Sequence, residues 1–230
     1  MRLSGLTLFF PCYNEEGNIE AVVRDAIAAA PAVAQAFEVL IVDDGSSDGT
    51  AEKVRQLMAA GLPVRLLQHP VNRGYGEALK SGFQNALMPW VFFSDGDSQF
   101  DLGELPKLAE LAASADLLCG YRIRRADPAY RLVNQKIFGW AARIFMGVRA
   151  RDINCAFKLI RRDVLRAIPL KSSGALINAE LLAKARARGF RIAEVGVHHR
   201  ARRRGLPTGA RLDVIARAVV EFWSIFRELR

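Results

Sequence analysis

The chain has 230 residues, 51% of them hydrophobic, which is enough to bury the core of one large domain. Its formal net charge of +9 is divided unevenly: residues 1–120 contain 8 Lys/Arg and 16 Asp/Glu, whereas residues 121–230 contain 25 and 8. This composition excludes a disordered chain, and the basic second half predicts an anionic partner such as nucleic acid, a phosphorylated substrate or a membrane surface.

Apolar segments of strand length alternate with helical patterns in the first half of the chain. The predicted strands are Leu6–Phe10, Phe37–Val42, Val64–Leu67 and Trp90–Phe93. The predicted helices cover Gly17–Ala30, Thr50–Ala60 and a segment that ends near Leu87. This alternation predicts an α/β fold with a doubly wound, mostly parallel sheet. In such sheets ligands bind at the carboxyl ends of the strands, where the polar loops of this chain lie.

The second half continues the pattern and then becomes basic and amphipathic. Helices are predicted at Asp101–Ala113 and Leu176–Arg188, and strands at Asp116–Tyr121, Ala156–Ile160 and Arg191–Val197. We found no internal repeat or linker, so we predict one domain over residues 1–209, with an acidic half (1–120) and a basic half (121–209), followed by an amphipathic helix over residues 210–230. The amphipathic segments at 122–147 and 210–230 fit either a protein contact or a membrane interface.

The cysteines and the lack of long apolar segments indicate the cellular compartment of the protein. Cys12, Cys119 and Cys155 have spacings that match neither a zinc site nor a disulfide framework, which is typical of core residues in a reducing compartment. The first ten residues do not read as a secretory signal, and no segment approaches the ~18 apolar residues of a membrane span. We therefore expect a cytoplasmic protein.

Asp95 and Asp97 follow the fourth predicted strand, separated by Gly96, and Gln99 comes two residues later. Two carboxylates and an amide oxygen are ligands that Mg²⁺ or Mn²⁺ accepts, with water and substrate phosphates completing the shell. Because Gly96 has no Cβ, we expect a ligand to approach the backbone there. An Asp-x-Asp after a strand is also common in ordinary loops, so this motif alone does not decide the function.

Five motifs occur in order along the chain: Pro11-Cys12-Tyr13-Asn14-Glu15, Asp43-Asp44-Gly45-Ser46, Asn72-Arg73-Gly74-Tyr75-Gly76, Asp95-Gly96-Asp97-Ser98-Gln99 and Cys155-Ala156-Phe157-Lys158. Together they resemble the family 2 glycosyltransferases, closest to the polyprenol-phosphate branch of dolichol-phosphate mannose synthase-like enzymes, over residues 6 to about 212. The resemblance implies a GT-A fold, a UDP- or GDP-linked sugar donor, Mg²⁺ or Mn²⁺, and transfer with inversion at the anomeric carbon.

The resemblance implies donor-binding roles for residues of the acidic half: Pro11, Tyr13, Asn14, Glu15, Asp44, Gly45, Gly74, Asp95 and Gly96. Asp44 resembles the acid that hydrogen-bonds the base, whereas Asp43 is open to a structural role. Asp95, Asp97 and Gln99 resemble the metal and diphosphate site, and Asp97 is the catalytic member. The loop around Gly74 resembles one that lines the donor, although a helix N-terminus with no ligand would look the same.

On the acceptor side, Arg122 and Arg131 resemble arginines that hold phosphates, and Arg202 resembles the arginine of a basic loop that closes over the substrates. This loop departs from the usual His-Tyr-Pro-Arg pattern at Arg200 and Ala201. The implied partners are a polyprenyl phosphate acceptor and an anionic membrane surface, reached through the amphipathic helices or through a membrane-protein partner. Nucleic acid is not an expected partner, and the implied location is the inner face of the cytoplasmic membrane.

The need for a general base depends on the acceptor. A phosphomonoester has a second pKa near 6, so a lipid phosphate is largely a dianionic nucleophile at neutral pH and needs arginines more than a base. A sugar hydroxyl would need a carboxylate, for which Asp152 is the candidate, but Asp152 could equally form an ion pair with Arg149 or Arg151. A non-enzymatic nucleic-acid-binding protein is a further alternative, which would leave the acidic loops unexplained.

Overall fold

The computed structural model describes residues 2–123, 139–140, 142–200, 222–223 and 225–227. These residues form a seven-stranded sheet of order β3-β2-β1-β4-β6-β5-β7. Its strands are β1 (Leu6–Cys12), β2 (Phe37–Asp43), β3 (Val64–Gln68), β4 (Trp90–Ser94), β5 (Leu117–Arg122), β6 (Phe157–Arg161) and β7 (Ile192–Val197). In this described sheet β6 is antiparallel to both of its neighbours, whereas every other pair is parallel.

The predicted doubly wound, mostly parallel sheet is therefore confirmed. Each predicted strand is present to within one or two residues at either end. The sequence pattern does not reveal the reversed direction of β6, because an apolar strand buried on both faces looks alike in either direction.

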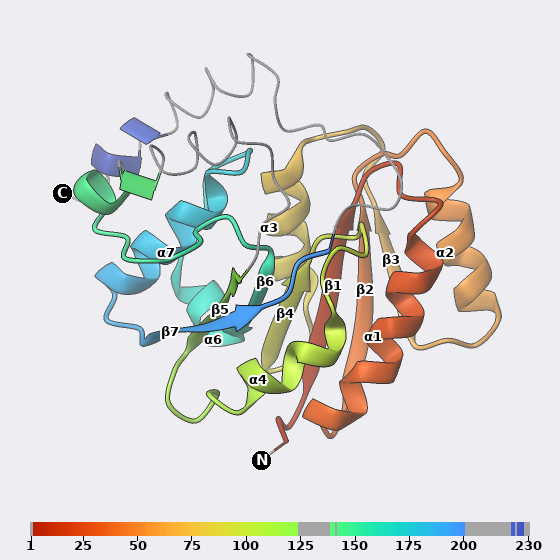
Figure 1. The fold of residues 1–230 in the computed structure, drawn as a ribbon. Helices are drawn as coiled ribbons and strands as arrows, with labels where there is room; N and C mark the ends of the chain where they lie inside the picture. Colours follow the sequence, from red (N-terminus) through yellow and green to blue (C-terminus); the bar gives the residue numbers. More distant parts are fainter. Residues whose placement is uncertain (1, 124–138, 141, 201–221, 224, 228–230) are drawn as a thin grey trace.

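Helices cover both faces of the sheet (Figure 1). They are α1 (Ile19–Val33), α2 (Thr50–Ala59), α3 (Tyr75–Asn85), α4 (Leu105–Ala109), α6 (Arg162–Ala167) and α7 (Ile177–Ala187). Helix α1 contacts both α2 and α4 in front of the sheet, and α3 packs on β1 and β2 from behind (Figure 1). This layering leaves the carboxyl ends of β1, β2 and β4 uncovered by the helices that follow them.

Two helices have different bounds from those predicted, and each of them contains a proline. The helix predicted over 101–113 begins with a 3₁₀ turn, Leu102–Glu104, because Pro106 has no N–H to donate to Leu102, and Leu105 N–H donates to that carbonyl instead. Helix α1 continues past Ala30 through Pro31, and Ala34 N–H donates to Ala30 O at 2.9 Å. The six-residue helix α6 is missing from the prediction because it is too short to show a periodic pattern.

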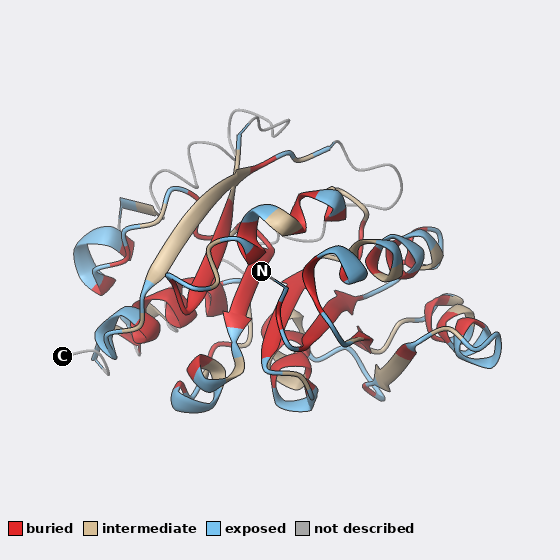
Figure 2. Cartoon of the chain, turned by 90° about the horizontal axis from the view of Figure 1, so that it is seen from below, coloured by how far each residue is buried: buried red, intermediate tan, exposed pale blue. Residues whose placement is uncertain are grey.

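Aromatic side chains fill the centre of the molecule. The ring centroids of Phe9, Phe83 and Phe93 lie 5.3–5.6 Å from one another. Helix α3 approaches this cluster closely, because a Cβ on Gly82 would lie 2.4 Å from the Phe9 ring. Figure 2 shows that the buried residues concentrate in the strands and on the inner sides of the helices. Such packing fixes the strand ends that carry the polar loops.

Several predicted features lie wholly or partly outside the described residues. Arg131, Arg202 and residues 210–221 are among them. Of the predicted C-terminal helix, residues 222–223 and 225–227 are described and are helical. Within the part of the chain that is described, no helix combines the length and apolar character needed to cross a bilayer.

Candidate active site

The carboxyl edge of the sheet brings the predicted loops together. In the β1–β2 ladder Cys12 pairs with Asp43, and Asp44 N–H donates to Cys12 O at 2.8 Å. On the next strand, His69 N–H donates to Asp43 O at 2.8 Å. The loops after β1, β2 and β3 therefore start side by side, and parallel pairing of β4 with β1 adds the acidic loop after β4. The convergence expected from the strand pattern is present.

The first loop holds its own polar groups in place and exposes one aromatic ring. Asn14 N–H donates to Ser46 Oγ at 2.9 Å, and Asn14 Oδ1 accepts from Ser47 N–H at 2.9 Å. Glu15 Oε2 accepts from Asn18 Nδ2 at 2.7 Å. Pro11 is buried within β1, whereas Tyr13 is exposed. Tyr13 therefore offers an exposed aromatic ring to a ligand.

Asp44 is a buried anchor for the loop that follows β3. Its Oδ1 accepts from Arg73 N–H at 2.9 Å and lies 2.7 Å from His69 Nδ1, while its Oδ2 accepts from Gly74 N–H at 2.8 Å. The carboxylate is 4% exposed. A nucleotide base that bound Asp44 would therefore have to bind carboxylate oxygens that already accept hydrogen bonds within the protein.

Asp43, for which the sequence left a structural role open, has the less occupied carboxylate. Its Oδ1 accepts from Ser46 N–H at 3.3 Å, and its Oδ2 has no hydrogen-bond partner among the described residues although it is buried. The sequence does not show which of the two carboxylates is occupied by hydrogen bonds, because Asp43 and Asp44 are adjacent and precede the same glycine.

Gly45 and Gly74 both occupy backbone conformations that favour glycine. Gly45 has φ +70°, and a Cβ there would lie 2.4 Å from the Val71 carbonyl carbon. Gly74 has φ +98° and directly precedes α3, facing Ser173 O. These glycines allow neighbouring loops to touch, and at Gly74 the chain turns into the helix.

The acidic loop after β4 holds two carboxylates close to each other. Asp97 is 7% exposed, and its Oδ1 accepts from Gln99 N–H at 3.1 Å. Burial and the charge of Asp97 raise the pKa of Asp95 to about 7. Gln99 Nε2 donates to Arg200 O at 2.9 Å, which leaves Oε1 as the ligand atom of that amide.

This donor set fits a divalent cation. The two partly desolvated carboxylates repel each other, and a bound hard cation would offset that repulsion. The described residues contain no cluster of three or more His, Cys, Asp or Glu side chains able to enclose a metal. Asp95, Asp97 and the Gln99 amide would therefore hold Mg²⁺ or Mn²⁺ only in part, with water or substrate phosphates filling the rest of the shell.

A buried polar network lies behind Asp95. The Tyr75 hydroxyl donates to Asp95 and accepts from the Asn178 amide. Asn178 Oδ1 accepts from Lys158 Nζ at 3.0 Å. Lys158 is fully buried, with further bonds to the Cys155 and Ile153 carbonyls, and its charge favours the ionised form of Asp95. These residues position one predicted metal ligand from the β6 side of the sheet.

Our sequence prediction gave no role to Tyr75, Lys158 or Asn178. A usable signal was present for Lys158, which follows three apolar residues and directly precedes Leu159 and Ile160 within a buried strand. A lysine that is fully buried in such a run requires acceptors, so it points to a polar network.

A contact within the protein leaves no room for a side chain at Gly96. A Cβ at this position would lie 2.4 Å from Cys12 Sγ. We expected glycine at position 96 so that a ligand could approach the backbone. The close packing of the acidic loop on β1 is a simpler reason for glycine there.

We expect Gly96→Ala to displace the acidic loop and weaken divalent-metal binding by about tenfold or more, since ligand positions shift when the loop is pushed from Cys12. Isothermal calorimetry with Mn²⁺ and a nucleoside diphosphate measures this loss. The double variant Gly96→Ala/Cys12→Ala removes the clashing sulfur and is expected to recover most of the affinity. Equal binding by Gly96→Ala and the unaltered chain would contradict the packing explanation.

The raised pKa of Asp95 predicts a pH-dependent stability of the metal-free protein. An unfolded aspartate titrates near 3.9, so between about pH 4 and pH 7 the unfolded chain has released a proton that folded Asp95 retains. This group therefore lowers stability as the pH rises through that window. We expect Asp95→Asn to be more stable than the unaltered chain near pH 8, with an advantage that shrinks toward pH 4 in urea unfolding. An advantage independent of pH would contradict a raised pKa.

Arg122 and Asp152 form a buried, bidentate ion pair. Arg122 Nε donates to Asp152 Oδ2 at 2.7 Å and Nη2 donates to Oδ1 at 3.0 Å. Among the described residues, Asp152 thus pairs with Arg122 and not with Arg149 or Arg151, which the sequence suggested. Both oxygens of the candidate base accept hydrogen bonds, and a candidate phosphate-binding arginine is committed to a carboxylate.

Three other polar residues near the sheet have structural partners. Glu180 pairs with Lys184 at 2.7 Å and accepts from the Lys171 and Ser172 N–H groups, which gives it a structural role. His198 Nδ1 lies 2.9 Å from Glu104 Oε1, while the His199 ring packs on Phe100 with centroids 4.9 Å apart. The two histidines face different partners, as expected for neighbours on a strand end.

Comparisons with known proteins identify the family of the chain. The profile of the family described as Glycosyl transferase family 2 matches residues 7–168. An undecaprenyl-phosphate 4-deoxy-4-formamido-L-arabinose transferase of Aeromonas hydrophila is 31% identical over 166 residues, which cover 71% of this chain and 51% of that protein. The chain therefore spans about half the length of such curated relatives. An uncharacterized glycosyltransferase of Mycobacterium bovis is 32% identical over 227 residues and is matched along 97% of its length.

Solved structures share the architecture. The glucosyl-3-phosphoglycerate synthase of Mycobacterium tuberculosis, in complex with Mn²⁺, UDP and glucosyl-3-phosphoglycerate, superposes with a TM-score of 0.73. The match covers 98% of this chain and 80% of that one at 22% identity. At this identity the likeness establishes the fold, and the predicted GT-A architecture is confirmed.

Proposed function

The chain belongs to glycosyl transferase family 2, and from this membership we propose an inverting, metal-dependent transfer of a sugar from a nucleotide-diphosphate sugar to a polyprenyl phosphate. The observation that carries the proposal is the pair Asp95 and Asp97 at the carboxyl edge of the sheet. Their mutual repulsion and partial burial suit a divalent cation that binds together with a diphosphate.

On the donor side, the loops after β1, β2 and β3 border the acidic pair. Tyr13 offers an exposed ring to the base or ribose, and Asp43 offers a buried carboxylate oxygen without a described partner. Asp44 then contributes chiefly by holding the loop at Gly74 in place. The solved relative that binds UDP with Mn²⁺ supports a UDP-linked donor, with a GDP-linked donor as the other candidate.

On the acceptor side, the proposal rests on the relatives that act on undecaprenyl phosphate and on the arginines of the basic half. Arg122 lies close enough to Asp95 to lower its pKa, which supports an acceptor-side role for its guanidinium. Arg131 and Arg202 keep their proposed phosphate-binding roles. A lipid acceptor also agrees with a peripheral position at the inner face of the cytoplasmic membrane, reached through amphipathic surfaces or a membrane-protein partner.

In this reaction an acceptor phosphate oxygen attacks the anomeric carbon in line while the nucleoside diphosphate departs. The cation, when bound, stabilises the negative charge that grows on the leaving diphosphate. Asp95, Asp97 and Gln99 orient that diphosphate, and the network of Tyr75, Asn178 and Lys158 keeps Asp95 in position. No protein group has to remove a proton, because the phosphate is already ionised at neutral pH.

Transfer to a saccharide hydroxyl is the main alternative, since it would use Asp152 as the general base. The bidentate ion pair with Arg122 counts against that role, because a paired carboxylate is a weaker base. The described residues of the basic half offer no observation that favours nucleic-acid binding.

Calorimetry with a nucleotide panel tests the proposal. UDP, GDP, CDP and ADP are each titrated into the protein with and without Mn²⁺. We expect one nucleoside diphosphate to bind in a metal-dependent manner, which also identifies the donor base. If no nucleotide binds with Mn²⁺ and the protein instead binds RNA or DNA, the proposed transferase site is wrong.

A further inference from the structure

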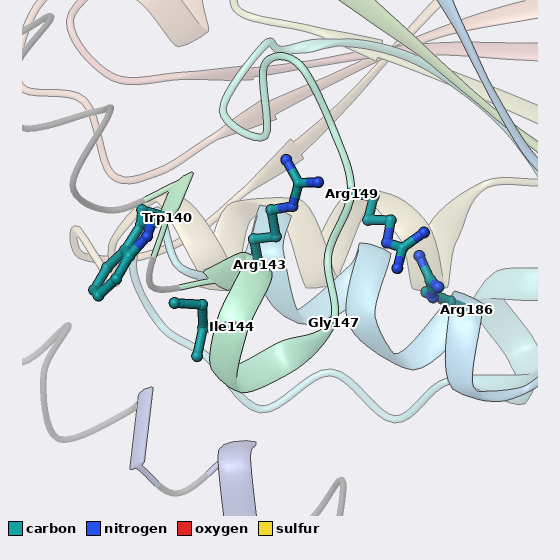
Figure 3. Close-up of a pocket in the computed structure, with 6 residues that line it drawn as sticks. All are labelled: Trp140, Arg143, Ile144, Gly147, Arg149 and Arg186. Atoms are coloured by element: carbon teal, nitrogen blue, oxygen red, sulfur yellow. The ribbon is translucent and has the colours of Figure 1, made fainter.

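A cavity of about 520 Å³ lies beside the 139–147 segment (Figure 3). It is lined by Trp140, Arg143, Ile144, Gly147, Arg149 and Arg186. Arg186 comes from the last turn of α7, and the other residues come from the segment between β5 and β6. Figure 3 shows Arg149 and Arg186 beside each other, with Trp140 and Ile144 along another part of the rim. The cavity therefore combines a cationic part with an apolar part.

The three arginines of this cavity have no counter-charge among the described residues. Within the described residues, the side chains of Arg143, Arg149 and Arg186 form neither a salt bridge nor a hydrogen bond. Some arginines elsewhere in the molecule are paired with acids: Arg161 and Arg191, for example, share Asp116. An adjoining cavity of about 310 Å³ contains Arg149 and Arg186 again with one acid, Glu194, whose Oε1 already accepts from Arg151 N–H.

Unmatched like charges at short range repel one another unless an anion lies between them. Guanidinium groups bind phosphate oxygens in a bidentate manner, so three of them around one cavity suit a phosphate group. A phosphate alone would leave the apolar rim unexplained.

The rim exposes large apolar side chains. Trp140 is 65% exposed and Ile144 is 54% exposed. Phe145 and Trp223 are also exposed, and their ring centroids lie 6.0 Å apart, so the apolar surface continues onto the last described helical residues. Figure 1 shows these two segments together, next to α7. Tryptophan and arginine side by side at a surface are typical of a membrane interface, where rings enter the head-group region and guanidinium groups reach lipid phosphates.

We propose that the cavity of Arg143, Arg149 and Arg186, with Trp140 and Ile144 on its rim, binds the head group of an anionic phospholipid and docks the enzyme on the bilayer. This inference rests on the proposed function and deepens it, because a lipid-linked acceptor would come from the same bilayer. The site differs from the acceptor site, since none of its arginines belongs to the proposed catalytic groups.

The test is flotation of the full chain with vesicles of phosphatidylcholine alone or of phosphatidylcholine mixed with phosphatidylglycerol. We expect binding to the anionic vesicles. The variant Arg143→Gln/Arg149→Gln/Arg186→Gln is expected to bind on the order of a hundredfold more weakly, since each arginine near such a surface contributes about fivefold. These side chains are exposed, so folding is expected to be unchanged in a thermal melt.

A matched control is Arg24→Gln/Lys53→Gln/Arg55→Gln, which removes the same charge from α1 and α2. We expect this control to bind anionic vesicles as the unaltered chain does. Equal losses in both triple variants would show a net-charge effect and overturn the site. Unchanged vesicle binding after the arginine substitutions, or after Trp140→Ser/Ile144→Ser, would overturn it as well.

The outcomes are separable from those of the nucleotide experiment. The Arg143/Arg149/Arg186 variant keeps Asp95, Asp97 and Gln99, so its metal-dependent nucleotide affinity is expected to stay within about twofold of the unaltered chain. Failure of nucleotide binding in the unaltered chain would contradict the transferase proposal without affecting the vesicle result. Glycerol phosphate added in solution distinguishes a free anion from a bilayer: if it occupied the cavity while vesicles did not bind, the docking proposal would be wrong.

Discussion

Asp97→Asn is expected to lower turnover by about a thousandfold or more and to remove metal-dependent nucleotide binding. The amide keeps the shape of the side chain and an acceptor for Gln99 N–H, so the loop stays in place. It removes the charge that, with Asp95, attracts the cation, and loss of such electrostatic stabilisation costs several kcal/mol in the transition state. Sugar transfer from the donor identified by calorimetry to a short-chain polyprenyl phosphate measures the effect.

The control for this variant is Asp25→Asn, which removes an exposed acid from α1 and leaves the site unchanged. It is expected to be fully active. The metal-free Asp97→Asn protein is also expected to unfold at the same urea concentration as the unaltered chain or higher, because one of two repelling charges is gone. Retention of Mn²⁺-dependent nucleotide binding by Asp97→Asn would remove the basis of the metal-site proposal.

Arg122→Met is expected to lower the free energy of unfolding by about 3–5 kcal/mol, since it leaves the Asp152 carboxylate buried without its partner. The side chains of Arg122 and Asp152 are 10% and 5% exposed, so solvent screens this pair little. Urea unfolding measures the loss. The double variant Arg122→Met/Asp152→Leu removes both charges and is expected to be more stable than Arg122→Met. If the single variant lost less than about 1 kcal/mol, the pair would behave as a surface ion pair.

The same pair distinguishes the two acceptor classes. Asp152→Asn retains one oxygen for Arg122 and removes the basicity of the carboxylate. With a lipid phosphate acceptor the variant is expected to turn over within about tenfold of the unaltered chain, because the nucleophile needs no base. Loss of turnover in a variant that unfolds normally would favour the saccharide-hydroxyl alternative.

The described arginines of the basic half differ in their partners. Arg122, Arg161 and Arg191 are paired with buried or partly buried acids. Arg143, Arg149 and Arg186 share one cavity without such partners. The net charge predicted an anionic partner, and these three described arginines are candidates to bind one.

The sequence by itself determined the strands, the acidic loop and the family. Apolar runs such as Phe37–Val42 that stop at polar loops identify the strands and their carboxyl ends, since a parallel sheet buries both faces of its strands. That pattern alone predicts that Asp44, Gly74 and Asp97 lie at one edge of the sheet. Local order along the chain carries this information, because each motif lies within a few residues of its own strand.

The tertiary structure alone decided which partner each polar group has. Arg122 and Asp152 are 30 residues apart and Lys158 and Asn178 are 20 apart, so no local pattern pairs them. The direction of β6, the contact of Gly96 with Cys12 and the occupied oxygens of Asp44 likewise depend on elements that meet only when the sheet is assembled. Hydrogen bonds and ion pairs require atoms within about 3 Å, and folding determines which distant residues come that close.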